Sequence, residues 1–272
     1  MADAPSSIRD NVSSPNAGPI TVTRQAVEKG TVCVLTMDAG ENRWNTAFTR
    51  AFDAALDEVE ATPGPTTLVT ASSNPKFFSN GLDLAWITGP SEGEAEGGER
   101  RVFAGEAMGL FGRLITLPLP TVCAVGGHAF GAGLMIAMAH DVRVMRADRG
   151  FLCANELELG FAIPDPEISL FAHKMSADAF HQTIVLAKRW SAPEALAAGI
   201  VQDIVPGELV LDAAMARATD LLRVARSREI TGWTKERLYG EHAAAIYGPH
   251  GPAHLLRHPD RYASGPGHIP VQ

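Results

Sequence analysis

Apolar and polar positions alternate with two different periods at the start of the chain. Residues 19–25 and 31–37 are β-branched runs on either side of Glu28-Lys29-Gly30, a pattern that predicts a hairpin. Residues 46–61 then carry apolar side chains at spacings of four and three, which predicts a helix with one apolar face. The change of period from two to 3.6 predicts a mixed α/β architecture.

The alternation of strands and helices continues through the middle of the chain. Strands are expected at 66–72, 120–125 and 141–146, separated by helices near 101–116 and from 131 onward. Strand, helix, strand, helix is typical of a parallel sheet wound by crossover helices. The fold class expected from the pattern alone is therefore a layered α/β domain.

The pattern turns helical from about residue 168. Ser191-Ala-Pro-Glu194 is a capping box with proline in the first turn, and it opens a helix that Gly199 ends. A short strand follows, and residues 207–226 are expected to form an amphipathic helix. The end of the chain is rich in Gly, Pro and His and is expected to be peripheral.

Composition and charge exclude several classes of protein. The chain of 272 residues has a net charge of -8 with 23 Lys and Arg, so no overall basic field favours nucleic acid or an anionic membrane. Its apolar runs fall short of the ~18 residues of a membrane span, and the N-terminus lacks the features of a signal peptide. Cys33, Cys123 and Cys153 lie in apolar surroundings and indicate buried thiols in a reducing compartment, so we expect a cytoplasmic protein.

Two glycine-rich turns offer backbone N–H groups. Residues 126–141 run from a strand through small residues into an apolar helix, whose first N–H groups attract negative charge. No P-loop or GxGxxG pattern is present, so an oxyanion suits this turn better than a phosphate, although such turns also serve tight packing of a helix on a sheet. In residues 76–83, Asp83 is expected to cap a helix, and the N–H of Asn80 is a candidate second donor.

Acidic residues stand out in the apolar stretch 149–164. Glu156 and Glu158 are one residue apart there, and apolar surroundings raise the pKa of a carboxyl toward neutrality, as a proton shuttle requires. A charge at the rim of an interface is an equally good interpretation of either residue taken alone. The histidines lack metal-binding spacing, so no metal site is predicted, and His128 is expected to pack in the fold or to line the pocket.

Together these segments resemble the crotonase, or enoyl-CoA hydratase/isomerase, superfamily over roughly residues 19–230. The matching segments are FFSNGLDL, the glycine-rich helix start, ENRWN at 41–45 and SAPEALAAGIVQDIVP. The resemblance implies that Asn80 and Ala132 donate two N–H groups to the thioester carbonyl of an acyl-CoA. It further implies substrate contacts from Ser79, Gly81, Leu82, Asp83, Gly131, Met135, Asn42 and Trp44, with Glu158 and His128 as weaker candidates.

The acidic residues decide the chemistry within this superfamily. Hydratases hold water between two glutamates, and the first of these positions is Met135 here, whose thioether accepts protons poorly. The second position is Glu156, and ANELELG resembles the NExxLG stretch of Δ3,Δ2-enoyl-CoA isomerases, with wording most like the plant peroxisomal type. The resemblance therefore implies a single-glutamate shuttle from C2 to C4 of a 3-enoyl-CoA, with coenzyme A as part of the substrate and no further cofactor.

Two other activities stay open at this point. One is another crotonase reaction, hydration or thioester hydrolysis, with water held by Glu156 or Glu158 and a further residue. The other is a non-catalytic acyl-CoA-binding paralogue.

The resemblance also implies an overall organisation. We expect a disordered tail at 1–18, a ββα spiral core at 19–205 and a helical C-terminal region at 206–272 that closes the CoA site and assembles a homotrimer or a dimer of trimers. Lys235 and Arg237 are candidates for contacts with the CoA phosphates, or are solvated surface groups.

Overall fold

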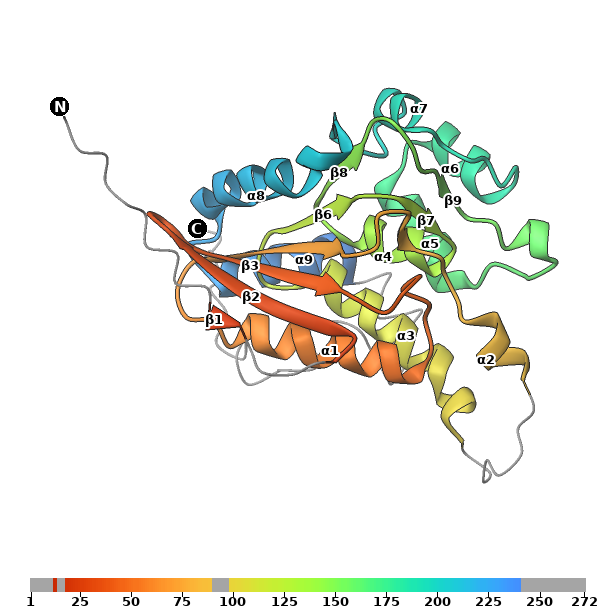
Figure 1. Ribbon diagram of the computed structural model, residues 1–272, viewed down its shortest axis with the longest axis horizontal. Helices are drawn as coiled ribbons and strands as arrows, with labels where there is room; N and C mark the ends of the chain where they lie inside the picture. Colours follow the sequence, from red (N-terminus) through yellow and green to blue (C-terminus); the bar gives the residue numbers. More distant parts are fainter. Residues whose placement is uncertain (1–11, 14–17, 90–97, 241–272) are drawn as a thin grey trace, which may run out of the picture.

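A large sheet organises the computed structural model, which describes residues 12–13, 18–89 and 98–240 (Figure 1). Within these residues the sheet has the order β1-β2-β3-β4-β6-β8-β10. Its strands are β1 (Val12–Ser13), β2 (Ile20–Val27), β3 (Gly30–Met37), β4 (Thr66–Ser72), β6 (Thr121–Val125), β8 (Val142–Arg146) and β10 (Asp203–Val205). The expected hairpin is the antiparallel pair β2–β3, and from β3 to β10 all neighbours are parallel, which confirms the α/β prediction.

A second, smaller sheet stands beside the carboxyl ends of the large one. It consists of the parallel strands β5 (Phe77–Ser79), β7 (His128–Phe130) and β9 (Leu152–Cys153). Each of these strands directly follows one strand of the large sheet, so that β4 leads to β5, β6 to β7 and β8 to β9. Helices then return the chain to the large sheet, which is the ββα spiral that the resemblance implies.

Helices cover both faces of the large sheet. In chain order they are α1 (Thr46–Glu60), α2 (Leu84–Thr88), α3 (Glu99–Ile115), α4 (Ala132–Ala139), α5 (Asp165–Lys174), α6 (Ala177–Ile184), α7 (Ala192–Ala197), α8 (Val210–Leu221) and α9 (Arg228–Lys235). Single turns are η1 (Leu157–Leu159), η2 (Gly207–Leu209), η3 (Leu222–Val224) and η4 (Glu236–Gly240). Helix α8 lies on one face, and α1 and α3 lie on the other (Figure 1).

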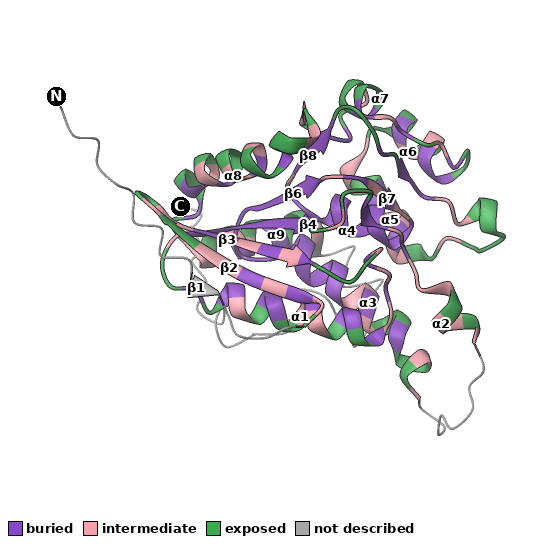
Figure 2. Ribbon diagram, viewed as in Figure 1, coloured by how far each residue is buried: buried purple, intermediate pink, exposed green. Residues whose placement is uncertain are grey.

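Two apolar clusters hold these layers together. On the α1 side, Phe52 and Leu56 are fully buried, as the helical spacing predicts, and they join a core that extends to α3, α4 and α5. On the α8 side, Ala214 and Ala218 pack on the β-branched residues of the central strands. The buried residues therefore lie in the middle of the molecule, between the helical layers (Figure 2).

The ends of the chain differ in part from expectation. Val12 and Ser13 pair with Arg24 and Thr23 of β2, so the prediction of a disordered segment at 1–18 is wrong for these two residues. The rest of that segment, 1–11 and 14–17, lies outside the described residues apart from Gly18. The C-terminal region is helical from α8 to η4, and residues 241–272 also lie outside the description.

The small sheet is packed backbone against backbone. A Cβ atom on Gly127 would collide with the carbonyl oxygen of Lys76, and one on Gly133 would collide with the carbonyl oxygen of Ser79. Glycine is therefore required where the chain from β7 to α4 passes the β5 segment. This contact fixes the distance between the two glycine-rich turns.

We predict that Gly133→Ala lowers the free energy of unfolding by about 1–3 kcal/mol, because the new methyl group must displace the Ser79 backbone. Gly105→Ala, in the exposed part of α3, is the matched helical control, since nothing lies within 4 Å of its added Cβ. That control gains up to roughly 1 kcal/mol from helix propensity. Urea unfolding of both variants measures the difference, and equal stabilities would show that the backbones do not need this close approach.

Candidate active site

The segment after β5 is held by the chain that precedes α1. The Trp44 N–H donates to the Gly81 carbonyl at 2.9 Å, and the Asp83 N–H donates to the Trp44 carbonyl at 2.9 Å. One residue earlier, the Asn80 N–H donates to the Glu41 carbonyl at 2.9 Å. Residues 41–45 and 80–83 therefore run side by side as a short parallel pair.

This pairing overturns the prediction for Asn80. Its N–H is already bonded to Glu41, and its side-chain Nδ2 donates to Glu41 Oε2 at 2.8 Å, so Asn80 faces away from the glycine-rich helix. The N–H of Leu82, by contrast, has no acceptor within the described ranges. The N–H of the next residue, Asp83, points to the Trp44 carbonyl, and adjacent N–H groups of an extended segment point to opposite sides, so the Leu82 N–H points away from residues 41–45.

The second donor is the N–H of Ala132, the first residue of α4. Gly131 precedes it with φ of 49°, a left-handed conformation that favours glycine, and no side chain caps the helix. The N–H groups of Leu134 and Met135 bond to the Gly131 carbonyl, whereas that of Ala132 finds no acceptor among the described residues. A Cβ on Gly81 would lie 3.7 Å from the Ala132 nitrogen, so the two turns meet here.

Glu156 lies directly against this meeting point. Its Oε1 is 2.8 Å from the place where Gly131 would carry a Cβ atom. The turn is fixed because the Glu156 carbonyl accepts from the N–H groups of Leu159 at 3.0 Å and Phe161 at 2.9 Å. The structure therefore places the predicted carboxylate beside the glycine-rich helix start.

The surroundings of the Glu156 carboxyl suit a group that takes up and returns a proton. Its Oε2 is buried without a hydrogen-bond partner in the described part of the chain, and burial raises the pKa of the carboxyl above its ordinary value. Met135, one turn into α4, is almost fully buried and offers only a thioether. The glycine-rich helix thus supplies no second acid.

Glu158 and His128 have structural contacts instead. Glu158 is exposed and forms an ion pair with Arg189 at 2.7 Å, which directs it away from the meeting point. His128 Nδ1 accepts from the Phe151 N–H at 3.2 Å, and its ring packs on Phe77 and Phe130, while burial lowers its pKa. The weaker candidacy of both residues agrees with these positions.

Several predicted substrate-binding side chains are engaged within the fold. Trp44 is fully buried and donates from Nε1 to Ser79 Oγ at 3.0 Å, and Ser79 Oγ donates to the Asn42 carbonyl at 2.7 Å. The Asn42 Nδ2 donates to Ser72 Oγ and to the Phe78 carbonyl. These side chains therefore hold the loop together, and substrate contact by Asn42, Trp44 and Ser79 stays a prediction.

The fourth side chain of that group caps a helix, as the pattern of 76–83 indicated. Asp83 Oδ1 accepts from the Trp86 N–H at 3.2 Å at the start of α2. Gly81, Leu82, Gly131 and Met135 remain at the meeting point of the two turns.

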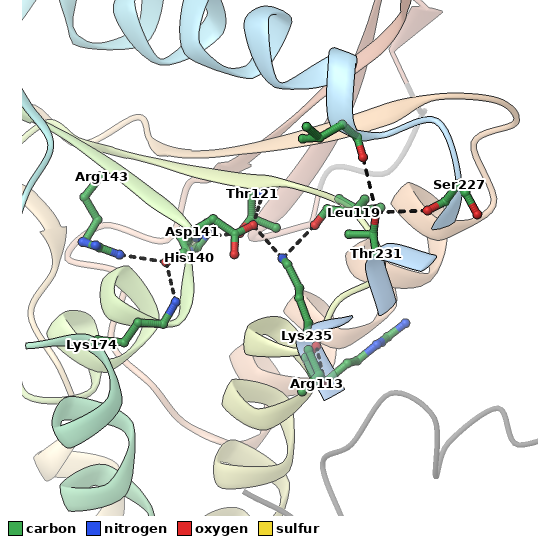
Figure 3. A network of polar contacts seen from close by, with 12 residues as sticks. Arg113, Leu119, Thr121, His140, Asp141, Arg143, Lys174, Ser227, Thr231 and Lys235 are labelled. Carbon is green, nitrogen blue, oxygen red and sulfur yellow. Dashed lines mark hydrogen bonds and ion pairs between the residues drawn. The ribbon is translucent and has the colours of Figure 1, made fainter. Parts of the chain in front are cut away.

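Lys235 also departs from expectation. Its side chain is buried, and Nζ donates to Asp141 Oδ2 at 2.6 Å and to the Leu119 carbonyl at 2.9 Å, as Figure 3 shows. Asp141 Oδ2 in turn accepts from the Thr121 N–H at 2.8 Å, so the group ties α9 to the sheet. Lys235 is therefore unavailable to CoA phosphates, while Arg237 is exposed and stacks on Trp233 at 3.6 Å.

Three further expectations from the sequence concern the thiols, a metal site and a membrane span. Cys33, Cys123 and Cys153 are buried free thiols, as predicted. Within the described ranges no group of three or more His, Cys, Asp or Glu side chains is placed to hold a metal ion. None of the helices described is both long enough and apolar enough to cross a membrane.

Most of the chain that carries this site matches the model of a known family. The family model for enoyl-CoA hydratase/isomerase matches residues 27–236. This chain belongs to the enoyl-CoA hydratase/isomerase family. An Arabidopsis thaliana peroxisomal enoyl-CoA delta isomerase 2 is 32% identical over 178 residues, covering 64% of this chain and 73% of the relative. A putative enoyl-CoA hydratase of Thermus thermophilus is 33% identical over 199 residues, covering 72% and 77%.

Solved structures of the family share the fold. An enoyl-CoA isomerase of Mycobacterium tuberculosis superposes with a TM-score of 0.72 at 27% identity, covering 84% of this chain and 94% of that one. The human mitochondrial Δ3,Δ2-enoyl-CoA isomerase has a TM-score of 0.73 at 21% identity, covering 91% and 90%. These similarities confirm the crotonase-like fold.

Sequence reasoning missed two features of this site. The N–H of Leu82 follows the glycine of the NGLD turn, and only the pairing with residues 41–45 distinguishes it from the N–H of Asn80. Glu167 is the second feature, a carboxylate in the first turn of α5 that is only 2% exposed. An acid in a first helical turn ordinarily indicates a favourable charge at the helix N-terminus, so no local pattern indicated its burial.

We predict that Ser79→Ala lowers the free energy of unfolding by about 1–3 kcal/mol, because it strands the buried Trp44 indole N–H and the Asn42 carbonyl. Ser73→Ala, which removes an exposed contact with Asp38, is the matched control and is expected to change stability by less than about 0.5 kcal/mol. Chemical denaturation measures both. A harmless Ser79→Ala would show that the loop does not depend on this hydroxyl.

Proposed function

We propose that this protein shifts the double bond of 3-enoyl-CoA thioesters to the 2-trans position. The observation that carries the proposal is one carboxylate, Glu156, lying against Gly131 beside two N–H groups that find no acceptor among the described residues, with Met135 in the place of a second acid. The delta isomerases among the relatives support the same choice. The reaction requires no metal or redox cofactor, and coenzyme A is part of the substrate.

The proposed mechanism begins at the thioester carbonyl. Its oxygen accepts hydrogen bonds from the N–H groups of Leu82 and Ala132, which makes the C2 protons acidic. Glu156 takes one C2 proton, and the electron pair of that C–H bond moves into a dienolate whose negative charge rests on the carbonyl oxygen. Glu156 then returns the proton to C4, the 2,3 double bond forms, and the carboxylate is restored.

The raised pKa of Glu156 suits both halves of this cycle. Burial raises the pKa of the carboxyl toward neutral pH. The carboxylate is therefore a stronger base when ionised and still returns its proton readily. The acid must be ionised to begin, so turnover is expected to fall as the pH drops through this raised pKa.

We predict that Glu156→Gln lowers kcat for 3-enoyl-CoA isomerisation by about 10²- to 10⁴-fold, because the amide cannot accept the C2 proton. Glu158→Gln is the matched control and is expected to retain activity, since its carboxylate pairs with Arg189 at the surface. The assay follows isomerisation of 3-enoyl-CoA and hydration of 2-enoyl-CoA side by side for all three proteins.

The same assay separates the competing activities. Rapid hydration of 2-enoyl-CoA without isomerisation would replace the proposal by a hydratase. Tight binding of CoA esters, with any measured turnover the same in wild type and in Glu156→Gln, would indicate a non-catalytic paralogue. Loss of turnover in Glu158→Gln but not in Glu156→Gln would reassign the base.

A second prediction concerns the oxyanion donors. Ala132→Pro removes the N–H of the first residue of α4, a position that tolerates proline, and is expected to lower kcat by about 10²- to 10³-fold. Ala177→Pro makes the same change at the first residue of α6, away from the site, and controls for the effect of proline on a helix start. Steady-state kinetics and thermal unfolding of both variants decide; similar kcat values would exclude Ala132 as a donor.

Self-association is also part of the proposal. Exposed apolar side chains gather on the turn that carries Glu156 and include Leu157, Leu159 and Phe161. Such a patch favours coverage by another chain. We keep the homotrimer or dimer of trimers as a prediction, and the molar mass in solution measures it.

A further inference from the structure

Glu167 is a buried acid that the proposed reaction does not use. It lies in the first turn of α5, it is 2% exposed, and its Oε1 has no hydrogen-bond partner in the described part of the chain. Helix α5 packs against α4, the helix that carries Ala132 and Met135. A second carboxylate thus stands behind the site, on the segment that directly follows the Glu156 turn.

Glu156 shares the unusual feature of Glu167. Each carboxylate has one buried oxygen without a partner, and in the described ranges neither forms an ion pair with Lys, Arg or His. An ionised carboxylate buried without donors or a countercharge is strongly destabilising. A buried Glu167 near a partly buried Glu156 therefore favours a state in which one of the two keeps its proton.

The neighbouring elements that the structure describes offer no charge that would change this balance. Helix α4, Ala132–Ala139, has no titratable side chain, and Glu158 of η1 is paired with Arg189 at the surface. On α5 itself, Asp165 and His173 are exposed, and Lys174 Nζ donates to the His140 carbonyl at the far end of the helix. The charged groups of α6, Asp178 and His181, are exposed.

The two carboxyls are not equivalent. Glu156 is only partly buried and lies at the open donors, whereas Glu167 is enclosed. Burial first, and the charge of Glu156 second, raise the pKa of Glu167 well above its ordinary value. Burial also raises the pKa of Glu156. Because Glu156 is the less buried of the two carboxyls, its charged form costs less, and it ionises before Glu167 does.

We propose that Glu167 is a positioning residue that keeps its proton while Glu156 is the ionised base, so that the pocket holds one negative charge when the dienolate forms. This inference rests on the proposed isomerisation. Its chemical reason is that the dienolate is itself an anion, and a second buried carboxylate beside it would repel the charge that the two N–H groups stabilise. Glu167 contributes by remaining neutral.

The first test is the pH profile of isomerisation. Wild type is expected to lose activity on the alkaline side by about tenfold for each pH unit once Glu167 ionises. Together with the loss of activity at low pH, where Glu156 is protonated, this gives a bell-shaped pH profile. Glu167→Gln, which mimics the neutral carboxyl and cannot ionise, is expected to lack that alkaline limb and to keep the acidic one. Glu158→Gln, the matched surface control, is expected to keep both limbs.

The second test needs no activity. Infrared spectra of protein with isotope-labelled glutamate detect the C=O stretch of a protonated carboxyl at neutral pH. We expect this band in wild type and in Glu158→Gln, and its absence in Glu167→Gln. In Glu156→Gln the band is expected to disappear at a lower pH than in wild type, because the neighbouring charge is gone.

The outcomes separate the two proposals. An alkaline limb that persists in Glu167→Gln, or a wild-type protein without the neutral-pH carboxyl band, overturns the role of Glu167. If wild type does not isomerise 3-enoyl-CoA, the proposed function fails, and the infrared spectra alone then decide whether Glu167 keeps its proton.

Discussion

The close approach of two glycine-rich backbones is the constraint on which this site depends. Gly127 and Gly133 let the chain around β7 and α4 pass the β5 segment at distances that no side chain would permit. The same approach brings Gly81 next to the Ala132 nitrogen and leaves room for the Glu156 carboxylate against Gly131. The positions of the two N–H groups and of the Glu156 carboxylate are therefore set by main-chain packing. The hydrogen-bonded side chains of Asn42, Trp44 and Ser79 hold one of the two backbones in place.

Charge is distributed in a way that fits this arrangement. Buried cations are paired elsewhere, as Lys235 with Asp141 and Arg113 with Asp53, and these pairs join helices to one another or to the sheet. Near α4 and η1, in contrast, the partly buried Glu156 and the buried Glu167 have no cation partner in the described residues. A region with backbone N–H groups that have no acceptor in the described residues, next to carboxyls of raised pKa, is suited to the proposed proton transfer between carbon atoms.

The fold was largely predictable from the sequence, and the site only in part. Hydrophobic periodicity predicts the β2–β3 hairpin and α1 closely, because each buries one regular face. Hydrophobic periodicity does not predict the strands β5, β7 and β9, because they are two or three residues long and lie within glycine-rich turns. The choice between Asn80 and Leu82 depends on which N–H groups pair with residues 41–45, and the burial of Glu167 depends on how α5 packs against α4; both are tertiary contacts that no local pattern encodes.

A crystal structure of the Glu156→Gln variant with a bound 3-enoyl-CoA would show whether the donors and the base meet at the substrate. We expect the thioester oxygen at about 3 Å from the nitrogens of both Leu82 and Ala132, with the substituted amide facing C2 and C4 of the acyl chain. A thioester oxygen bonded elsewhere, or an amide side chain turned away from the acyl carbons, would contradict the proposed arrangement of donors and base.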